Sequence, residues 1–181
     1  KEMQALGMYP VAAFFKRLMG DESFIFHANG SDYSAIQLST FLLKKIKRDA
    51  EAALGQKITQ AVITVPAYFK DPERNATIAA GKAAGIDVMQ VINEPTAAAV
   101  AYGLHNSENK QHILVYDLGG GTFDVSLLEY ESDTTRVKNS VGNHQLGGKD
   151  WDDRIIEYLA SQFQDEFGLD PLEDSESMAE L

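Results

Sequence analysis

The order of hydrophobic and polar positions along the chain alternates between helical and strand spacing, which is typical of an α/β protein. Ser-Ala-Ile-Gln at residues 34–37 has the form of a capping box, and apolar positions recur at helical spacing from there to Gly55. The continuous apolar run at residues 61–65 predicts a strand buried on both faces. Asp-Pro at residues 71–72 provides an N-cap and a first-turn residue for a helix that extends to Gly85.

A second strand and helix follow with the same alternation. Residues 87–92 predict the strand, and the chain then changes to Asn-Glu-Pro and an alanine-rich helix over residues 96–102. This order of strands and helices implies right-handed parallel crossovers. Binding residues in parallel sheets gather at the carboxyl ends of strands, and Glu94 lies at one such end, in a turn fixed by Pro95. Glu94 is therefore a candidate site residue, although a solvent-exposed turn glutamate fits the same pattern.

The first part of the chain carries weaker signals. Residues 1–20 predict a helical segment, with Pro10 in its first turn and Gly20 as its stop. Residues 21–32 predict weak strand or loop. The basic pair at residues 16–17 is, by itself, typical of a solvated helix face. The next helix carries a basic group with the same interpretation: Lys44, Lys45, Lys47 and Arg48.

The second half of the chain predicts a different architecture. Residues 104–111 are polar and predict a surface connection. Two strands follow within residues 112–130 and a third at about residues 136–141, so the strands form a meander and begin a new, antiparallel sheet. After the sheet, an amphipathic helix that ends at Gly168 is predicted from four apolar positions at helical spacing: Trp151, Ile155, Leu159 and Phe163.

The glycine-rich turn between the first two of these strands is the main candidate for chemistry. Three consecutive glycines, Gly119, Gly120 and Gly121, leave their N–H groups bare and allow a bulky anion to approach. Asp117 closes one strand and Asp124 lies early in the next, so two carboxylates flank the turn, as a magnesium–nucleotide site requires. The pattern is not a P-loop, which needs Gly-Lys-Ser/Thr before a helix. An ordinary glycine-rich hairpin is the alternative.

A second glycine pair lies at residues 147–148, directly before the last predicted helix. Glycines at a helix start allow a phosphate or ribose to approach the backbone closely. A tight loop that needs positive φ would use the same residues, so both interpretations stand.

Composition and charge narrow the classes of function. The chain has 181 residues, enough for one domain or two small lobes, and its net charge of −11 argues against nonspecific nucleic-acid binding. No segment approaches the roughly 20 apolar residues of a membrane helix. The absence of cysteine excludes disulfides and thiolate metal sites and is typical of a reducing compartment. Both ends look cut, because the chain begins Lys-Glu-Met-Gln and stops where a helical pattern begins, so we expect part of a longer protein.

Four motifs together resemble one family. They are Val-Ile-Thr-Val-Pro-Ala-Tyr-Phe at residues 62–69, Ile-Asn-Glu-Pro-Thr-Ala-Ala-Ala at residues 92–99, Asp-Leu-Gly-Gly-Gly-Thr-Phe-Asp at residues 117–124, and Leu-Gly-Gly at residues 146–148. In this order they are similar to the nucleotide-binding domain of DnaK-type, seventy-kilodalton heat-shock chaperones, and the resemblance covers nearly the whole chain. Residues 14–20 and the pair Leu104-His105 resemble the divergent bacterial branch called HscC.

The resemblance implies the α/β fold of actin and the sugar kinases, which is ribonuclease H-like, with ATP in a cleft between two lobes. Residues 1–111 would be the later part of the first lobe, a helical subdomain followed by strand, helix, strand and helix. Residues 112–181 would begin the second lobe with a β-meander and a helix. The family's first phosphate turn would lie before Lys1 and its adenosine motifs after Leu181, so we expect this fragment alone to hydrolyse ATP negligibly.

The resemblance also implies individual site residues. Lys16 matches the lysine that approaches the γ-phosphate and positions the attacking water, which overrides the solvated-face interpretation. Glu94 and Asp117 match carboxylates around the magnesium ion and its waters. Asp124 matches a residue implicated in potassium binding near the phosphates. The implied catalytic group is Lys16, Glu94, Asp117 and Thr122.

Backbone and relay positions complete the implied site. The turn formed by Gly119, Gly120, Gly121 and Thr122 matches the family's second phosphate-binding turn. Gly148 matches a glycine that lines the nucleotide cleft. Pro66 and Arg74 match a relay that reports the nucleotide state to the substrate domain. The implied cofactors are ATP or ADP, Mg²⁺ and K⁺.

The implied function is the ATPase part of a cytoplasmic chaperone that binds and releases unfolded polypeptides through a domain outside this chain. A J-domain co-chaperone and a nucleotide exchange factor are the implied partners, and neither nucleic acid nor membrane is expected. Gln90 occupies a position that is often arginine and helps engage J-domain proteins, which argues against that partnership. Lys149 follows Gly-Gly where an acidic residue is usual, which would alter the charge of the cleft.

Two other functions share this fold. A sugar or acetate kinase would demand a sugar pocket in place of the chaperone motifs, and the motif at residues 92–99 argues against it. A non-catalytic, actin-like assembly protein would form filaments when nucleotide is added. A peptide-binding domain downstream in the parent protein would rule that alternative out.

Overall fold

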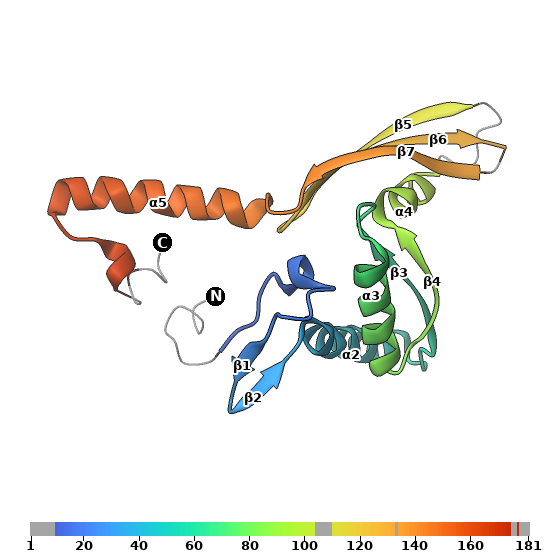
Figure 1. Ribbon diagram of the computed structural model, residues 1–181, viewed down its shortest axis with the longest axis horizontal. Helices are drawn as coiled ribbons and strands as arrows, with labels where there is room; N and C mark the ends of the chain where they lie inside the picture. Colours follow the sequence, from blue (N-terminus) through green and yellow to red (C-terminus); the bar gives the residue numbers. More distant parts are fainter. Residues whose placement is uncertain (1–9, 104–109, 133, 175–176, 178–181) are drawn as a thin grey trace.

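The computed structural model describes residues 10–103, 110–132, 134–174 and 177, and its elements confirm the α/β class. The helices and strands of the first half lie together beside a second sheet, and one long helix extends away from the end of that sheet (Figure 1). The expectations for residues 1–9 and for the connection at residues 104–109, including Leu104 and His105, lie outside the described residues.

The described start of the chain is mostly not helical, so the prediction of a helical segment up to residue 20 is wrong there. Phe15–Leu18 form a single 3₁₀ turn, η1, and residues 10–13 are not helical. Phe14 has a φ of 57°, in the left-handed region, and a right-handed helix cannot pass through such a residue. Gly20, the predicted stop, follows with a φ of 83°.

A short hairpin and a long helix follow η1. β1 (Phe26–Ala28) pairs antiparallel with β2 (Ser31–Tyr33), where weak strand was predicted. α2 (Ala35–Leu54) begins with the predicted capping box, because Gln37 N–H donates to Ser34 Oγ and Ser34 N–H donates to Gln37 Oε1. The predicted glycine after this helix ends it in a left-handed conformation.

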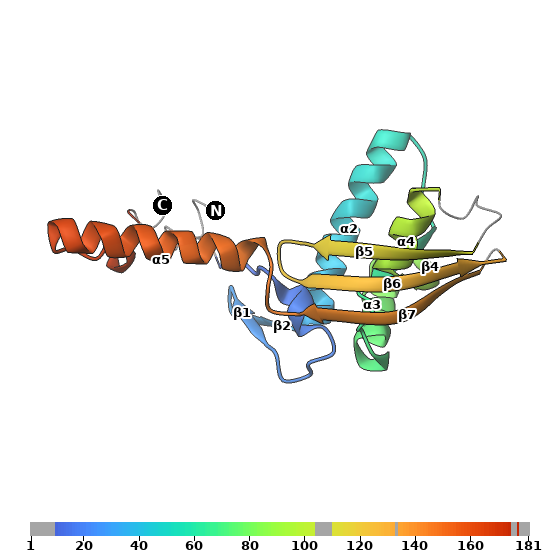
Figure 2. The ribbon, with the colours of Figure 1, turned by 90° about the horizontal axis from the view of Figure 1, so that it is seen from above.

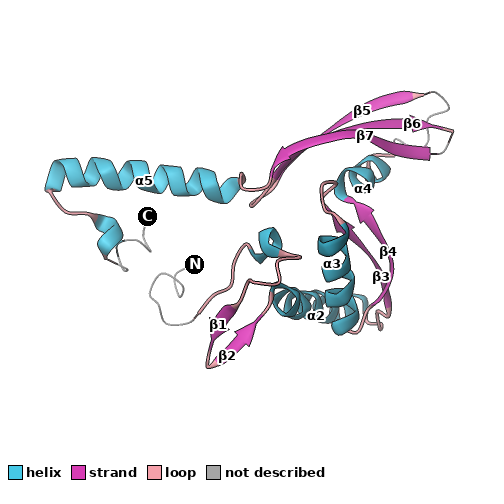
Figure 3. Cartoon of the chain, viewed as in Figure 1, coloured by secondary structure: helices cyan, strands magenta, loops and turns pink. Residues whose placement is uncertain are grey.

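The first sheet is a parallel pair. β3 (Gln60–Val65) and β4 (Asp87–Asn93) are joined by α3 (Asp71–Ala83), which confirms the predicted strand–helix–strand unit. The prediction that β3 is buried on both faces is wrong. α3 covers one face of the pair (Figure 3). Val62, on the other face, is 51% exposed. An apolar strand sequence therefore permits burial on both faces, but a face is buried only where another element packs against it.

Two helices begin earlier than predicted. The N-cap of α3 is Lys70, whose N–H donates to the Glu73 carboxylate over 3.0 Å, and Asp71 is the first helical residue. α4 (Glu94–Ala101) begins directly after β4, two residues before the predicted start. Glu94 is thus the first residue of a helix, where a carboxylate is favoured by the helix dipole, and not a turn residue.

The second half forms the predicted antiparallel meander. β5 (Gln111–Leu118), β6 (Phe123–Glu131) and β7 (Thr134–Asn143) lie side by side in that order (Figure 2). α5 (Gly148–Phe167) leaves the end of this sheet and is followed by the short 3₁₀ turn η3 (Pro171–Glu173). α4 from the first half lies against one face of the sheet, so the two halves are in contact.

The main buried cluster belongs to the first half and joins η1, α2, the end of β3 and α3: Met19, Ala35, Val65, Phe69 and Ala76. Several apolar side chains on the outer faces are instead exposed: Val62, Met89, Leu114, Tyr116, Val141, Trp151 and Ile155. Among the described helices, none is long and apolar enough to cross a membrane.

Candidate functional site

The candidate site centres on the turn between β5 and β6. Asp117 and Asp124 face each other in the strand register, one before and one after the turn. Gly119 N–H donates to Thr122 O over 2.9 Å and closes the turn. Within the described residues, the N–H groups of Gly120 and Gly121 donate to no protein acceptor. Such bare, neighbouring amides can receive an anion.

The turn lies against the start of α5, which explains the second glycine pair. A Cβ on Gly147 would lie 2.5 Å from Gly121 N, so close packing of two backbones requires glycine there. The φ of Gly147 is −168°, so the tight-loop interpretation that needs positive φ is wrong for this residue. The first amides of α5 donate to the turn over 3.0 Å: Gly148 N–H to Gly119 O, and Lys149 N–H to Gly120 O.

A cation and a carboxylate reach this place from the first half of the chain. Lys16 Nζ, on η1, donates over 2.9 Å to Oε1 of Glu94, the first residue of α4. The Lys16 and Glu94 side chains are 51% and 23% exposed. Ion pairs this accessible to water are weak, so an anionic ligand can compete with Glu94 for the ammonium group.

Asp124 is the buried carboxylate of the site. It is 5% exposed, and its Oδ1 has no hydrogen-bond partner among the described residues. Burial raises the pKa of Asp124, and the negative charges of Asp117 and Glu94 raise it further. His144 and Lys16 act in the opposite direction. These effects place all five groups within electrostatic reach of one another.

The carboxylates do not form a closed metal cage. Within the described part of the chain, no three His, Asp or Glu side chains are placed to hold a metal ion by themselves. The unpaired Oδ1 of Asp124 is nevertheless a hard oxygen ligand that lacks a partner. A partial set of carboxylates suits a cation that keeps waters and takes further ligands from phosphate.

Tyr68 and His144, which the sequence pattern did not indicate as site residues, join the two halves beside the turn. The rings are stacked, with 3.4 Å between centroids and 14° between planes. Burial, together with the charges of Asp124 and Glu94, raises the pKa of Tyr68 to about 12. A hydrogen bond with the Thr122 side chain acts in the opposite direction. The available signal was the position of Tyr68 inside the motif at residues 62–69.

Arg17 was also missed as a site residue. Its Nε donates to Gly121 O over 2.7 Å, and its Nη2 donates to Asp150 Oδ2 over 2.6 Å. Sequence alone assigned it, with Lys16, to a solvated face. Neighbouring residues of a 3₁₀ turn point in different directions, so Lys16 and Arg17 reach different elements.

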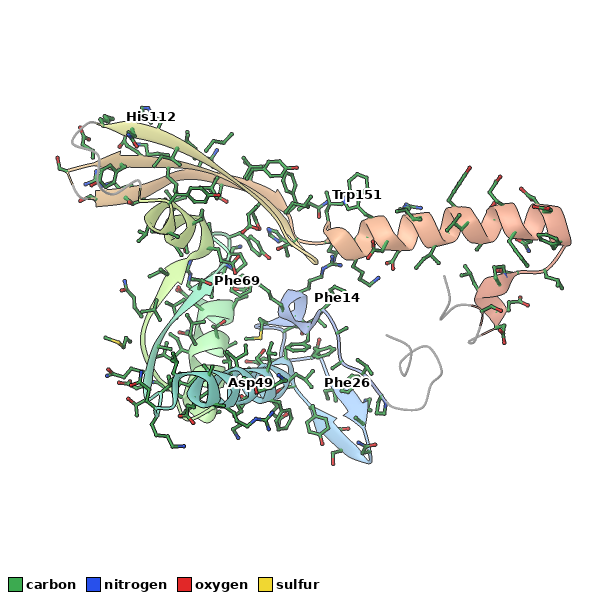
Figure 4. The ribbon with its side chains drawn as sticks, turned by 180° about the vertical axis from the view of Figure 1, so that it is seen from behind. Phe14, Phe26, Asp49, Phe69, His112 and Trp151 are labelled. Atoms are coloured by element: carbon green, nitrogen blue, oxygen red, sulfur yellow. The ribbon has the colours of Figure 1, made fainter. Side chains whose placement is uncertain are left out.

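Pro66 and Arg74 are linked through the backbone of Phe69. Phe69 N–H donates to Pro66 O over 3.1 Å, and Arg74 Nε donates to Phe69 O over 2.8 Å. Arg74 Nη2 donates to Asn93 Oδ1 over 2.5 Å. Phe69, which lies between Pro66 and Arg74 in this set of bonds, is labelled in Figure 4. Arg74 therefore ties the loop after β3 to the end of β4, next to Glu94. A role as a relay stays a prediction.

Comparison with known proteins identifies what this chain is similar to. Residues 11–181 match the family model described as Hsp70 protein. Over 169 residues the chain is 48% identical to a protein of Mycoplasmopsis pulmonis named Chaperone protein DnaK, a match that covers 93% of this chain and 28% of that protein. The chain thus spans less than a third of the length of this curated relative. Neither match favours the sugar-kinase or the actin-like alternative.

Proposed function

This chain belongs to the Hsp70 family, and we propose that it forms part of the ATP-binding and ATP-hydrolysing domain of a molecular chaperone. The observation that carries the proposal is the meeting of groups from both halves at one glycine turn. Lys16 and Glu94 come from the first half, and Asp117, Asp124 and the bare amides come from the second. A lysine, carboxylates and turn amides are the groups that phosphoryl transfer uses.

We propose that the fold is the actin-like one and that residues 1–111 and 112–181 belong to its two lobes. The β3–β4 pair and the β5–β6–β7 sheet lie on opposite sides of this boundary and share no strand pairing among the described residues. The change from parallel to antiparallel pairing supports the same division.

The residues present fit a magnesium nucleotide and a potassium ion. We propose that Asp117 and Glu94 hold the magnesium through its waters, and that Asp124 holds potassium with its unpaired, buried oxygen. When bound, a divalent cation neutralises charge on the phosphate oxygens and so stabilises the leaving phosphate.

The chain's own groups provide the positioning on which such hydrolysis mainly depends. The N–H groups of Gly120 and Gly121 would donate to phosphate oxygens, and Thr122, at the end of the same turn, would face the same anion. Lys16 would exchange Glu94 for the terminal phosphate. Glu94, released from that ion pair, could then accept a hydrogen bond from the attacking water.

The remaining proposals concern the intact protein. Unfolded polypeptide would be bound by a domain outside this chain, in the cytoplasm, with a nucleotide exchange factor as a partner. Pro66 and Arg74 would carry the nucleotide state to that domain. Gln90 is exposed on β4, and the lack of an arginine there argues against a J-domain partner.

A calorimetric titration with Mg-ADP in potassium buffer tests the site. We expect the unmodified chain to bind and Asp117→Ala to bind at least about tenfold more weakly, because a carboxylate beside the magnesium waters is lost. Asp152→Ala is the matched control, since Asp152 is an exposed aspartate on α5. Equal loss of binding in both variants, or no binding by the unmodified chain, would contradict the site assignment for this chain.

Turnover gives a second measurement. Because the chain spans 28% of its relative, we propose that it hydrolyses ATP negligibly by itself. Turnover close to that of intact family members, abolished by Lys16→Ala, would contradict this proposal.

A further inference from the structure

Arg17 crosses from the first half of the chain to the second. It lies in η1 beside Lys16, yet its guanidinium bonds Gly121 O and the Asp150 carboxylate, which are 104 and 133 residues away along the chain. The Arg17 side chain is 18% exposed, so these bonds are partly shielded from water. Lys16, by contrast, bonds Glu94 within the first half.

The carbonyls of the glycine turn are each held by a donor. Gly148 N–H holds Gly119 O and Lys149 N–H holds Gly120 O, so α5 fixes two of them. Arg17 Nε holds the third, Gly121 O.

The C=O and N–H of a planar trans peptide point in opposite directions. Holding three successive carbonyls on one side therefore turns the next three amides, those of Gly120, Gly121 and Thr122, to the other side. Among the described residues, none of these three N–H groups donates to a protein acceptor.

The contacts around Arg17 keep its guanidinium in place. Asp150 also accepts from Gly147 N–H over 2.8 Å, and its pKa is lowered chiefly by the hydrogen bond from Arg17. Phe14, in its left-handed conformation, places its ring 5.8 Å from the Arg17 guanidinium, a cation–π distance. A Cβ on Gly121 would lie 3.4 Å from Arg17 Nε and 3.6 Å from Phe14 Cδ1, so both side chains cover this glycine. Figure 4 shows Phe14 beside the end of the β5–β6 hairpin.

We infer that Arg17 is a positioning residue for the anion site: by holding the Gly121 carbonyl from the first half of the chain, it aims the Thr122 N–H at a phosphate group of a nucleoside di- or triphosphate. The inference rests on the proposed function. The direction of the Thr122 N–H then depends on contact between the two halves through Arg17, whereas the directions of the Gly120 and Gly121 N–H groups depend on α5 alone. Arginine suits this task because its planar fork bonds a carbonyl and a carboxylate together, which the single ammonium of lysine does not reproduce.

Amide NMR and calorimetry on the whole 181-residue chain test the inference, with Mg-ADP as the probe. In the unmodified chain, Mg-ADP should shift the amide signals of Gly120, Gly121 and Thr122. In Arg17→Ala the Thr122 shift should disappear while the two glycine shifts stay, and the affinity for Mg-ADP should fall about tenfold. Arg154→Ala is the matched control, because Arg154 is an exposed arginine on α5 that pairs with Glu157.

Two further measurements separate positioning from a general loss of structure. Millimolar methylguanidinium should restore the Thr122 shift and part of the Mg-ADP affinity of Arg17→Ala. The substitution Arg17→Lys should retain neither the Thr122 shift nor the affinity of the unmodified chain. An unchanged Thr122 shift and an unchanged Mg-ADP affinity in Arg17→Ala would overturn the role of Arg17 but would leave the proposed function unaffected. No Mg-ADP binding by the unmodified chain would overturn the inference together with the proposed function.

Discussion

The two sheets supply the same site in different ways. β3 and β4 are parallel, so both carboxyl ends reach one edge, where the loop after β3 carries Pro66 and Tyr68 and the start of α4 carries Glu94. β5 and β6 are antiparallel, so the turn itself lies at the site and presents backbone amides between Asp117 and Asp124. A crossover thus places single side chains, whereas a hairpin places a row of backbone groups with a carboxylate at each end.

Their close contacts differ in the same sense. In the first sheet, Gly81 of α3 packs against the side chains of Val88 and Ile63, which can move. In the second, Gly142 of β7 packs against the carbonyl of Phe123 and the Asp124 carboxylate. Backbone carbonyls within a strand pair cannot retreat without breaking the pair. The second sheet should therefore tolerate added volume less well than the first.

Alanine substitutions at these two glycines give the largest expected effect. Gly142→Ala should lower the free energy of unfolding by about 3 kcal/mol, because the new Cβ overlaps Phe123 O and the Asp124 carboxylate. Gly81→Ala should cost about 1 kcal/mol, because overpacking against side chains is partly offset by better helix propensity. Urea unfolding followed by circular dichroism measures both. Equal losses of unfolding free energy in the two variants would contradict the expectation that the second sheet tolerates added volume less well than the first.

Asp124→Asn tests the buried carboxylate of the second sheet. Without potassium at neutral pH, the variant should be about 1 kcal/mol more stable than the unmodified chain, because it removes a buried charge with an unpaired oxygen. Because the pKa of Asp124 is raised in the folded state, this advantage is present at neutral pH, decreases as the pH falls through the raised pKa, and is absent below the ordinary value of 3.8.

Potassium should stabilise the unmodified chain and not Asp124→Asn. Asp117→Asn, on the facing strand position, is the control and should change the free energy of unfolding by less than about 0.5 kcal/mol. Thermal unfolding with and without potassium at several pH values measures these differences. A destabilised Asp124→Asn would show that the carboxylate has a partner that compensates its burial.

The smallest expected effect lies at the far end of the second sheet, near His112 and away from the glycine turn (Figure 4). There Glu129 pairs with Lys110 over 2.9 Å and with Lys138 over 3.3 Å. The hydrogen bond from Lys110, followed by that from Lys138, lowers the pKa of Glu129 to about 2. The interactions of charged Glu129 with its lysines therefore stabilise the folded state fully above the ordinary pKa of 4.5, and this stabilisation is lost as the pH falls towards 2.

Glu129→Gln should therefore flatten the loss of stability between pH 4.5 and about 2. Glu131→Gln, an exposed neighbour that shares only Lys110, is the control and should leave that slope nearly unchanged. Acid titrations of the thermal midpoint give the slope. Identical slopes in both variants would mean that Glu129 gains nothing from its two lysines.

Local interactions made much of this protein predictable from its sequence. The capping box of α2 involves Ser34 and Gln37, three residues apart, and both bonds form as predicted. The three glycines of the β5–β6 turn likewise act over a few residues, because they allow the backbone to turn tightly there, so the hairpin and its flanking carboxylates followed from the local pattern. Motif resemblance indicated Lys16 and Glu94, and in the structure these two side chains form an ion pair.

Tertiary structure alone decided the partners of the site residues. Arg17 finds Gly121 and Asp150 more than 100 residues away, and nothing in its local pattern distinguishes it from a solvated arginine. Asp124 is buried because β7 brings Gly142 against it. β3 is open on one face because no layer covers that face in the described chain. Sequence spacing sets the local backbone conformation, whereas burial and charge pairing depend on which distant segments the fold brings into contact.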